Sequence, residues 1–216
     1  SLSLHATKGA DNIAAVWPPS GYFLALLILM PSSARVAAFA GMVTASLSAN
    51  LYGGAPLWSC LAFTFSNGCE ALVGLWILRR REPGELSFMV PRSVVSFCVA
   101  AFAASFVSAV FAWGLAGKGP DFFLSWLTTV LLGMLIVTPP IVMLARMVDT
   151  KALTNASTAM KAEATAILTA AGLVTILAFS QSQFPATFLP CVAVAAAAYR
   201  LGPFGAAAGM LLVTII

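Results

Sequence analysis

One acidic side chain, Glu70, lies well inside an apolar stretch of the sequence. It precedes Arg79 by nine positions, so a helix would place it about 13 Å from that residue, near the middle of a membrane. A carboxylate at that depth is costly unless it is protonated, paired or facing a wet cavity. Asn67 shares its helix face, and Ser66 is adjacent. These residues predict either a ligand or proton site, or a polar clamp that fixes helix packing.

A second unusual group is the run Trp17, Pro18, Pro19, Ser20 and Gly21. The two prolines lack backbone donors and disfavour helix at the residues before them. A helix from Pro19 to Met30 would span only about 18 Å, too short to cross alone. We expect a helix that continues, kinked, through the prolines. The alternative is a loop followed by a short helix inside the membrane, with free N–H groups around Ser20 and Gly21 that hold an anionic group.

Other residues point to helix packing rather than chemistry. Thr138-Pro139-Pro140 predicts a second break, which survives in a membrane only where neighbours or water satisfy the freed carbonyls. Asn50 ends an apolar segment, and we expect it to cap that helix rather than to bond across to another. Gly41 lies in a stripe of small residues, and Gly205 and Gly209 form a G-x-x-x-G pattern. Both patterns favour close helix contact, within one bundle rather than between two copies.

The sequence offers no recognisable catalytic set, metal site or cofactor site. His5 is the sole histidine, without further ligands at recognisable spacing, and we expect it to be solvated. The four cysteines all lie in apolar spans without C-x-x-C spacing. The net charge of +4 does not indicate nucleic-acid binding, because the basic residues sit at helix ends and form no patch.

The composition predicts a membrane protein. Of the 216 residues, 61% are hydrophobic and 8% are charged, whereas soluble domains carry about 25% charged residues. We expect an all-α, polytopic transmembrane bundle of about eight spans with proline-broken helices. The segments lie near residues 12–30, 34–52, 56–79, 92–116, 122–146, 160–180, 185–199 and 203–216. The chain opens just ahead of one apolar segment and stops within another, so we expect residues 1–216 to be a single transmembrane domain of a longer protein.

The basic residues predict an orientation. If the end of the third segment, Arg79 to Arg81, is cytoplasmic, nine basic residues fall on that side: Arg35, Arg79, Arg80, Arg81, Arg92, Arg146, Lys151, Lys161 and Arg200. The other side keeps Lys8 and Lys118. This bias obeys the positive-inside rule. The same orientation places five aromatic residues near the outer interface: Trp17, Tyr52, Trp58, Trp113 and Trp126.

Four patches in the right order resemble the first membrane-associated sensor (MASE) family. They are A-A-V-W-P-P-S-G-Y-F-L-A-L-L-I-L (residues 14–29), Asn67 and Glu70 with the arginines 79–81, Trp126 with G-M-L-I-V-T-P-P (133–140), and F-L-P with Y-R-L-G-P-F-G (188–205). One departure is Ser66 before Asn67, where the family often has alanine. The resemblance implies an input domain of a bacterial sensor histidine kinase or of an enzyme that makes or degrades cyclic diguanylate. It also implies an inner-membrane location, a cytoplasmic output domain after the last helix, and a homodimer through the output region.

The sequence therefore predicts a membrane-embedded sensory domain for signal transduction that is not itself an enzyme. An unknown small ligand or a proton would bind at Glu70, Asn67 and the residues from Trp17 to Gly21, with Asn50 and Trp126 as further candidates, and would shift the bundle between two packings. The alternatives are a small-solute transporter or channel that uses the same polar residues, and a membrane anchor with no sensing of its own. In the anchor, Glu70 and Asn67 would be dispensable.

Overall fold

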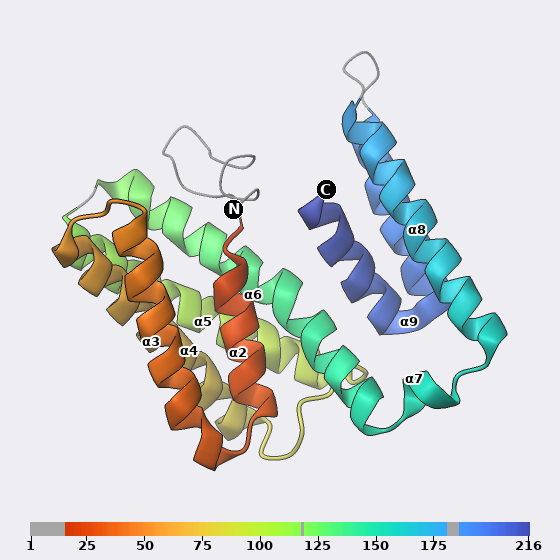
Figure 1. The fold of residues 1–216 in the computed structure, drawn as a ribbon, viewed down its shortest axis with the longest axis horizontal. Helices are drawn as coiled ribbons and strands as arrows, with labels where there is room; N and C mark the ends of the chain where they lie inside the picture. Colours follow the sequence, from red (N-terminus) through yellow and green to blue (C-terminus); the bar gives the residue numbers. More distant parts are fainter. Residues whose placement is uncertain (1–15, 118, 181–185) are drawn as a thin grey trace. The chain divides into compact units, whose positions relative to one another are not determined.

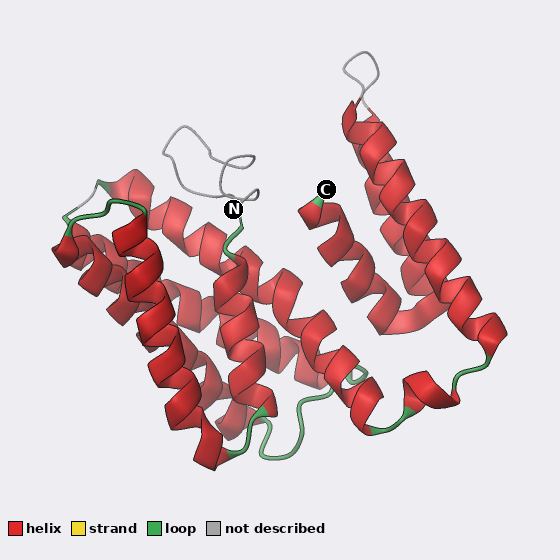
Figure 2. Ribbon diagram, viewed as in Figure 1, coloured by secondary structure: helices red, strands yellow, loops and turns green. Residues whose placement is uncertain are grey.

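The computed structural model describes residues 16–117, 119–180 and 186–216. Over these residues the chain is helical and contains no strand, which confirms the all-α class (Figure 2). The helices, in chain order, are α2 (Pro18–Leu29), α3 (Ser32–Tyr52), α4 (Leu57–Arg81), α5 (Pro91–Ala116), α6 (Pro120–Asp149), α7 (Ala152–Asn155), α8 (Thr158–Ser180) and α9 (Leu189–Ile215), with a 3₁₀ turn, η1 (Ala186–Phe188), before the last.

The helices form two compact units, one reaching to Thr138 and the other beginning at Pro139. The boundary falls within α6, at the proline pair Pro139 and Pro140. The helix runs through both prolines, so the expected second break is not an interruption of helical structure.

Proline, glycine and arginine define the ends of the helices in the N-terminal unit. Pro18 and Pro91 occupy the first turns of α2 and α5, where no intrahelical N–H is needed. Gly117 ends α5 in the left-handed conformation, with φ of 62°. The last turn of α4 holds Arg79, Arg80 and Arg81, whose charges complement the negative end of the helix dipole.

Small residues let α4 and α5 pack closely in this unit. The buried face of α5 is made mainly of serine and alanine: Ser93, Ser96, Phe97, Ala100, Ala101, Ala104, Ser105, Ser108, Ala109 and Ala112. At Gly74 of α4, an added Cβ would lie 3.3 Å from Leu24 and 3.5 Å from Ala104. Three helices therefore meet at that glycine.

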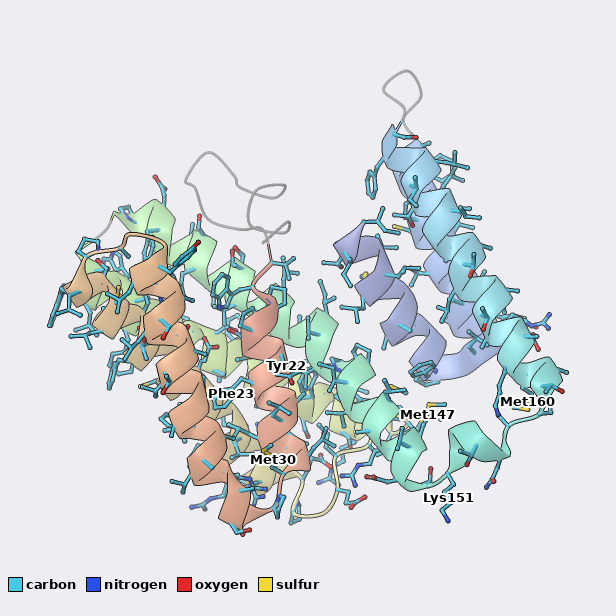
Figure 3. All side chains as sticks on the ribbon, viewed as in Figure 1. Tyr22, Phe23, Met30, Met147, Lys151 and Met160 are labelled. Atoms are coloured by element: carbon cyan, nitrogen blue, oxygen red, sulfur yellow. The ribbon has the colours of Figure 1, made fainter. Side chains whose placement is uncertain are left out.

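The short helix α2 packs against α4, and half of its residues are buried. Phe23, Leu27 and Ala71 form an apolar core against which Phe39 and Leu75 pack. The rings of Phe23 and Phe39 lie 6.1 Å apart, and Figure 3 shows Phe23 on α2. By contrast, α3 buries no residue completely, so it lies at the edge of this unit.

The arginines gather at one end of the N-terminal unit. Figure 1 shows that the α2–α3 turn and the connection from α4 to α5 lie at the same end. Arg35 donates from Nε to the Leu27 carbonyl (2.9 Å) and from an Nη to the Met30 carbonyl (2.8 Å), which satisfies the end of α2. At the same end, Ser93 and Ser96 of α5 donate to the carboxylate of Glu82, which follows α4.

In the C-terminal unit, α9 doubles back on itself (Figure 1). Gly202 has φ of 66° and ψ of −156°, a conformation open essentially to glycine alone, and Pro203 follows it. The two halves then pack at close range: a Cβ on Gly205 would lie 2.2 Å from the carbonyl oxygen of Ala197. Helix α8 packs on α9, and Arg200 forms an ion pair with Glu163 of α8.

The expected count of about eight spans is too high. In the part of the chain that the structure describes, five helices have the length and apolar composition to cross a membrane: α4, α5, α6, α8 and α9. Of these, α9 reverses at Gly202, so neither of its halves has that length alone. Helix α2 has only 12 residues, α3 carries too many polar side chains, and the last two predicted segments form the single kinked helix α9.

Candidate functional site

The polar centre of the N-terminal unit is the carboxyl group of Glu70, which is only 2% exposed. Two serine hydroxyls face it, Ser20 from α2 and Ser108 from α5. No lysine, arginine or histidine among the described residues forms an ion pair with it. An ionised carboxylate is therefore enclosed by neutral groups, which makes its charge costly.

Glu70 and the start of α2 lie at the same depth. Glu70 is nine residues before Arg79, and Ser20 is ten residues before Met30, beside which Arg35 bonds. At 1.5 Å per residue, both lie about 14 Å from the arginine-bearing end. Since a bilayer core is about 30 Å thick, this depth is close to its middle.

Helix α2 begins at this depth instead of running through it. Val16 and Trp17 are not helical, and Trp17 caps the helix that starts at Pro18. The structure thus has the second of the two expected forms, a chain that starts a short helix within the bundle, and not a kinked continuous helix. The N–H of Ser20 bonds to the Trp17 carbonyl (3.3 Å), and the two prolines carry no N–H. The group held near this helix end is the chain's own carboxyl at Glu70, which the positive end of the helix dipole favours.

Close backbone contact fixes the start of α2 on α6. The N–H of Trp17 donates to the carbonyl of Thr129 (3.1 Å), and the hydroxyl of Thr138 donates to the carbonyl of Gly21 (2.9 Å). A Cβ on Gly133 would lie 2.1 Å from the carbonyl oxygen of Trp17, and one on Gly21 would lie 2.2 Å from that of Gly133. Only glycines permit this approach.

Trp126 joins the site through Ser108. Its indole Nε1 donates to the Ser108 hydroxyl oxygen (3.0 Å). Because an indole can only donate, Ser108 accepts this bond and keeps its own O–H for the carboxyl group of Glu70. Phe63 and Phe122 pack against the Trp126 ring at centroid distances of 4.9 and 5.5 Å. The stacking holds the indole in place.

Two oxygens beside each other at the centre lack hydrogen bonds. Neither Oε2 of Glu70 nor Oγ of Ser20, which is 4% exposed, has a hydrogen-bonded partner among the described residues. Buried polar atoms are normally satisfied, and a serine hydroxyl can both donate and accept. The two oxygens therefore leave room for a proton or a small polar ligand to bind between them.

Asn67 points to a different neighbour from Glu70. Its amide nitrogen donates to the Ser46 hydroxyl of α3 (3.3 Å), and Ser46 is bonded to Thr64 (2.9 Å). The amide oxygen of Asn67 has no partner among the described residues. The shared helix face inferred from their spacing therefore divides between two contacts, α3 for Asn67 and α2 with α5 for Glu70.

The remaining candidates lie apart from this centre. Asn50 donates to the Ser46 carbonyl of its own helix (2.8 Å) and does not reach Glu70. Gly41 is exposed on α3, with no atom within 4 Å of where a Cβ would stand. Gly205 and Gly209 lie in the C-terminal unit, between the halves of α9. Among the described residues, no group of three or more metal-ligating side chains is present.

Sequence reasoning did not connect Ser108, Gly133 or Thr138 with Glu70, and it named Thr138 only as part of an expected helix break. Each comes from a helix far along the chain from Glu70, so spacing alone gives no contact. A signal existed for Ser108, because Ser93, Ala100, Ala104 and Ser108 recur at helical spacings in an otherwise bulky apolar run.

The comparison with protein families bears on the whole chain. The family model MASE1 matches residues 1–216, while no curated protein and no solved structure matches the chain. The MASE1 family consists of membrane-embedded sensory domains, and the resemblance read from four patches is confirmed. The buried carboxyl group, the half-length helix that starts beside it and the apolar helices around them are thus parts of a sensory domain that belongs to the MASE1 family.

Proposed function

We propose that this domain senses a proton or a small polar ligand at Glu70 and converts its binding into a movement of α2. The observation that carries the proposal is the carboxyl group, 2% exposed, beside the proline-initiated start of α2 with no cationic partner among the described residues. Binding would give a partner to Oε2 of Glu70 and Oγ of Ser20, which have none among the described residues.

The movement follows from where the contacts lie. Ser20 belongs to α2, Ser108 belongs to α5, and both face the same carboxyl group. A change at Glu70 therefore alters the attraction between α2 and α5, and α2, the shorter of the two, would shift. Two packings that differ in this one polar contact are enough for a switch, provided the ligand favours one of them.

The domain would pass this change to a cytoplasmic output domain, a histidine kinase or a diguanylate cyclase, in a homodimer in the bacterial inner membrane. The arginine-bearing end of the N-terminal unit would face the cytoplasm, as the excess of basic residues on that side favours. Family membership supports this arrangement, because MASE1 domains are sensory inputs.

The test is Glu70→Gln in the intact protein, with output activity measured against external pH. Glutamine keeps the size of the side chain and always carries a donor, so we expect output locked at the level of the protonated form and its pH dependence lost. Asp149→Asn is the matched control, since it removes the same charge from an exposed position at the end of α6. It should leave the response unchanged.

A second variant, Trp126→Phe, tests the contribution of the Ser108 hydroxyl to the response. Phenylalanine keeps the packing against Phe63 and Phe122 but removes the indole N–H that fixes Ser108. We expect the pH midpoint of the response to move while its amplitude stays. If the pH response were unaltered in both Glu70→Gln and Trp126→Phe, the polar centre would serve only helix packing and not sensing.

A transporter is the rival function, because half-length helices that begin at mid-depth are also typical of transporters. Reconstituted vesicles separate the two. Solute flux that depends on Glu70, together with output that does not, would replace the sensory proposal.

A further inference from the structure

A groove opens on the surface of the N-terminal unit, away from Glu70. Its volume is about 370 Å³, and apart from one arginine its lining is apolar: Leu27, Val36, Phe39, Ala40, Leu72, Leu75 and Arg35. The walls come from α2, α3 and α4. Val36 and Leu72 are 78% and 53% exposed, so the groove faces the surroundings of the bundle.

The groove runs between α3 and α4, toward the centre of the membrane. On α4, Leu72, Leu75 and Arg79 are spaced by three and four residues and so share one face. From Arg79 to Leu72 the helix descends about 10 Å. One end of the groove is therefore cationic and close to the membrane surface, and the rest is apolar.

The cationic end of the groove holds Arg35, with Arg79 of α4 nearby. Arg79 is close enough to Arg35 for their charges to repel. Arg35 uses Nε and one Nη on the carbonyls of Leu27 and Met30, which leaves most of its N–H groups for another acceptor. Neither arginine forms an ion pair with an acidic residue in the part of the chain that the structure describes. An anion between them would relieve the repulsion.

We propose that this groove binds an anionic phospholipid, with one acyl chain along α3 and α4 and the phosphate between Arg35 and Arg79. The charge and the shape together select this occupant. Guanidinium groups bind phosphate oxygens in a bidentate manner, and basic pockets between transmembrane helices bind anionic head groups. A free phosphate would leave the apolar length unused, and a neutral lipid would leave the arginine pair uncompensated.

This inference depends on the membrane location of the helices and not on sensing at Glu70. Its test is native mass spectrometry of the intact protein in detergent with equal amounts of phosphatidylglycerol and phosphatidylcholine of the same acyl chains. We expect retention of phosphatidylglycerol over phosphatidylcholine. Inorganic phosphate should not displace the lipid if the acyl chain contributes to binding.

Substitutions separate the two halves of the site. Arg79→Gln should lower the preference for phosphatidylglycerol about fivefold, since one basic residue near an anionic lipid surface is worth ~1 kcal/mol. Arg81→Gln removes the same charge from the same helix end, but Arg81 is off the face shared by Leu72, Leu75 and Arg79, so the preference should stay unchanged. Ala40→Phe should fill the groove and reduce retention of both lipids, whereas Ala45→Phe, on exposed α3 surface outside the groove, should not.

Three results would overturn the proposal. The first is equal retention of the two lipids by the unmodified protein. The second is an equal loss of preference in Arg79→Gln and Arg81→Gln, which would indicate general surface charge. The third is full lipid retention in Ala40→Phe, which would show that no acyl chain occupies the groove.

Discussion

The contact between the start of α2 and the middle of α6 depends on Gly133. A Cβ at this position would lie 2.1 Å from the carbonyl oxygen of Trp17 and 2.8 Å from its carbon. Carbon and oxygen normally approach no closer than about 3.3 Å, so Gly133→Ala must push the two backbones apart by about 1 Å. Both atoms belong to main chain, so no side-chain rotation can relieve the clash.

The magnitude follows from two opposing effects. Overpacking of a tight contact costs about 1–3 kcal/mol. Alanine in a helix interior is favoured over glycine by up to ~1 kcal/mol, which partly masks the clash. Gly41→Ala isolates this second effect, because Gly41 also lies inside a helix but has no atom within 4 Å of its Cβ position. The difference between the two variants is then the clash itself.

The assay is thermal unfolding in detergent, followed by the helical circular dichroism signal. For a chain of this size, 1–3 kcal/mol corresponds to a difference in Tm on the order of 2–12 °C, with Gly133→Ala the lower. Gly41→Ala should melt at or slightly above the unmodified protein. If Gly133→Ala melted as high as Gly41→Ala, α2 would not lie against α6 at backbone distance, and the assembly of the site around Glu70 would be refuted.

Two further predictions concern a carboxylate and a glycine outside the polar centre. The hydroxyls of Ser96 and Ser93 bond to the carboxylate of Glu82 and hold its pKa below the usual 4.5. A lowered pKa in the folded state means that these bonds stabilise the fold above pH 4.5 and are lost as the pH falls below it. The Tm of the unmodified protein should therefore drop more between about pH 5 and pH 3 than that of Glu82→Gln, and parallel curves would contradict this. Gly202→Ala should cost about 1–3 kcal/mol through its φ of 66°, whereas Gly114→Ala, in open space within α5, should not; equal melting of the two would show that α9 does not need its reversal at Gly202.

The helices themselves could be predicted closely from the sequence. The segments expected at 56–79, 92–116 and 160–180 appear as Leu57–Arg81, Pro91–Ala116 and Thr158–Ser180. The ends of the first two coincide with proline, glycine and arginine, which interrupt an apolar run and also end a helix. Composition and local geometry act on the same residues here, so the prediction succeeded.

The number of spans and the reversal of α9 were harder to predict. Hydropathy measures apolar content and not the direction of the backbone. The sequence around Gly202 and Pro203 showed a boundary between two segments, but not that the second half would fold back onto Ala197. The apolar runs at α2 and α3 also misled, because the helix at α2 has only 12 residues and α3, although 21 residues long, carries many polar side chains.

Glu70 could be predicted as part of the site from the sequence, whereas its partners could not, for a physical reason. A carboxyl group in an apolar run is conspicuous, since its cost in a membrane must be compensated somewhere. Its compensating groups are not conspicuous, because serine hydroxyls and glycine backbones are common in membrane helices. Ser108 and Gly133 join the site only through tertiary contacts with Glu70 and Trp17, and those contacts connect segments distant in the chain.

Helix α2 connects the two polar regions of the N-terminal unit, the carboxyl group at mid-depth and the arginine-bearing end. At its start, Ser20 faces Glu70 at mid-depth, and at its end the carbonyls of Leu27 and Met30 bind Arg35. The helix is about 18 Å long, carries no charged residue, and is continuous between these contacts, so a displacement at one end must move the other. Its buried face packs as a rigid body against α4 through Leu24 and Leu27, and packed cores shift between discrete arrangements instead of deforming smoothly. A proton bound at the carboxyl group, as we propose, would therefore act on a helix whose far end is bonded to Arg35.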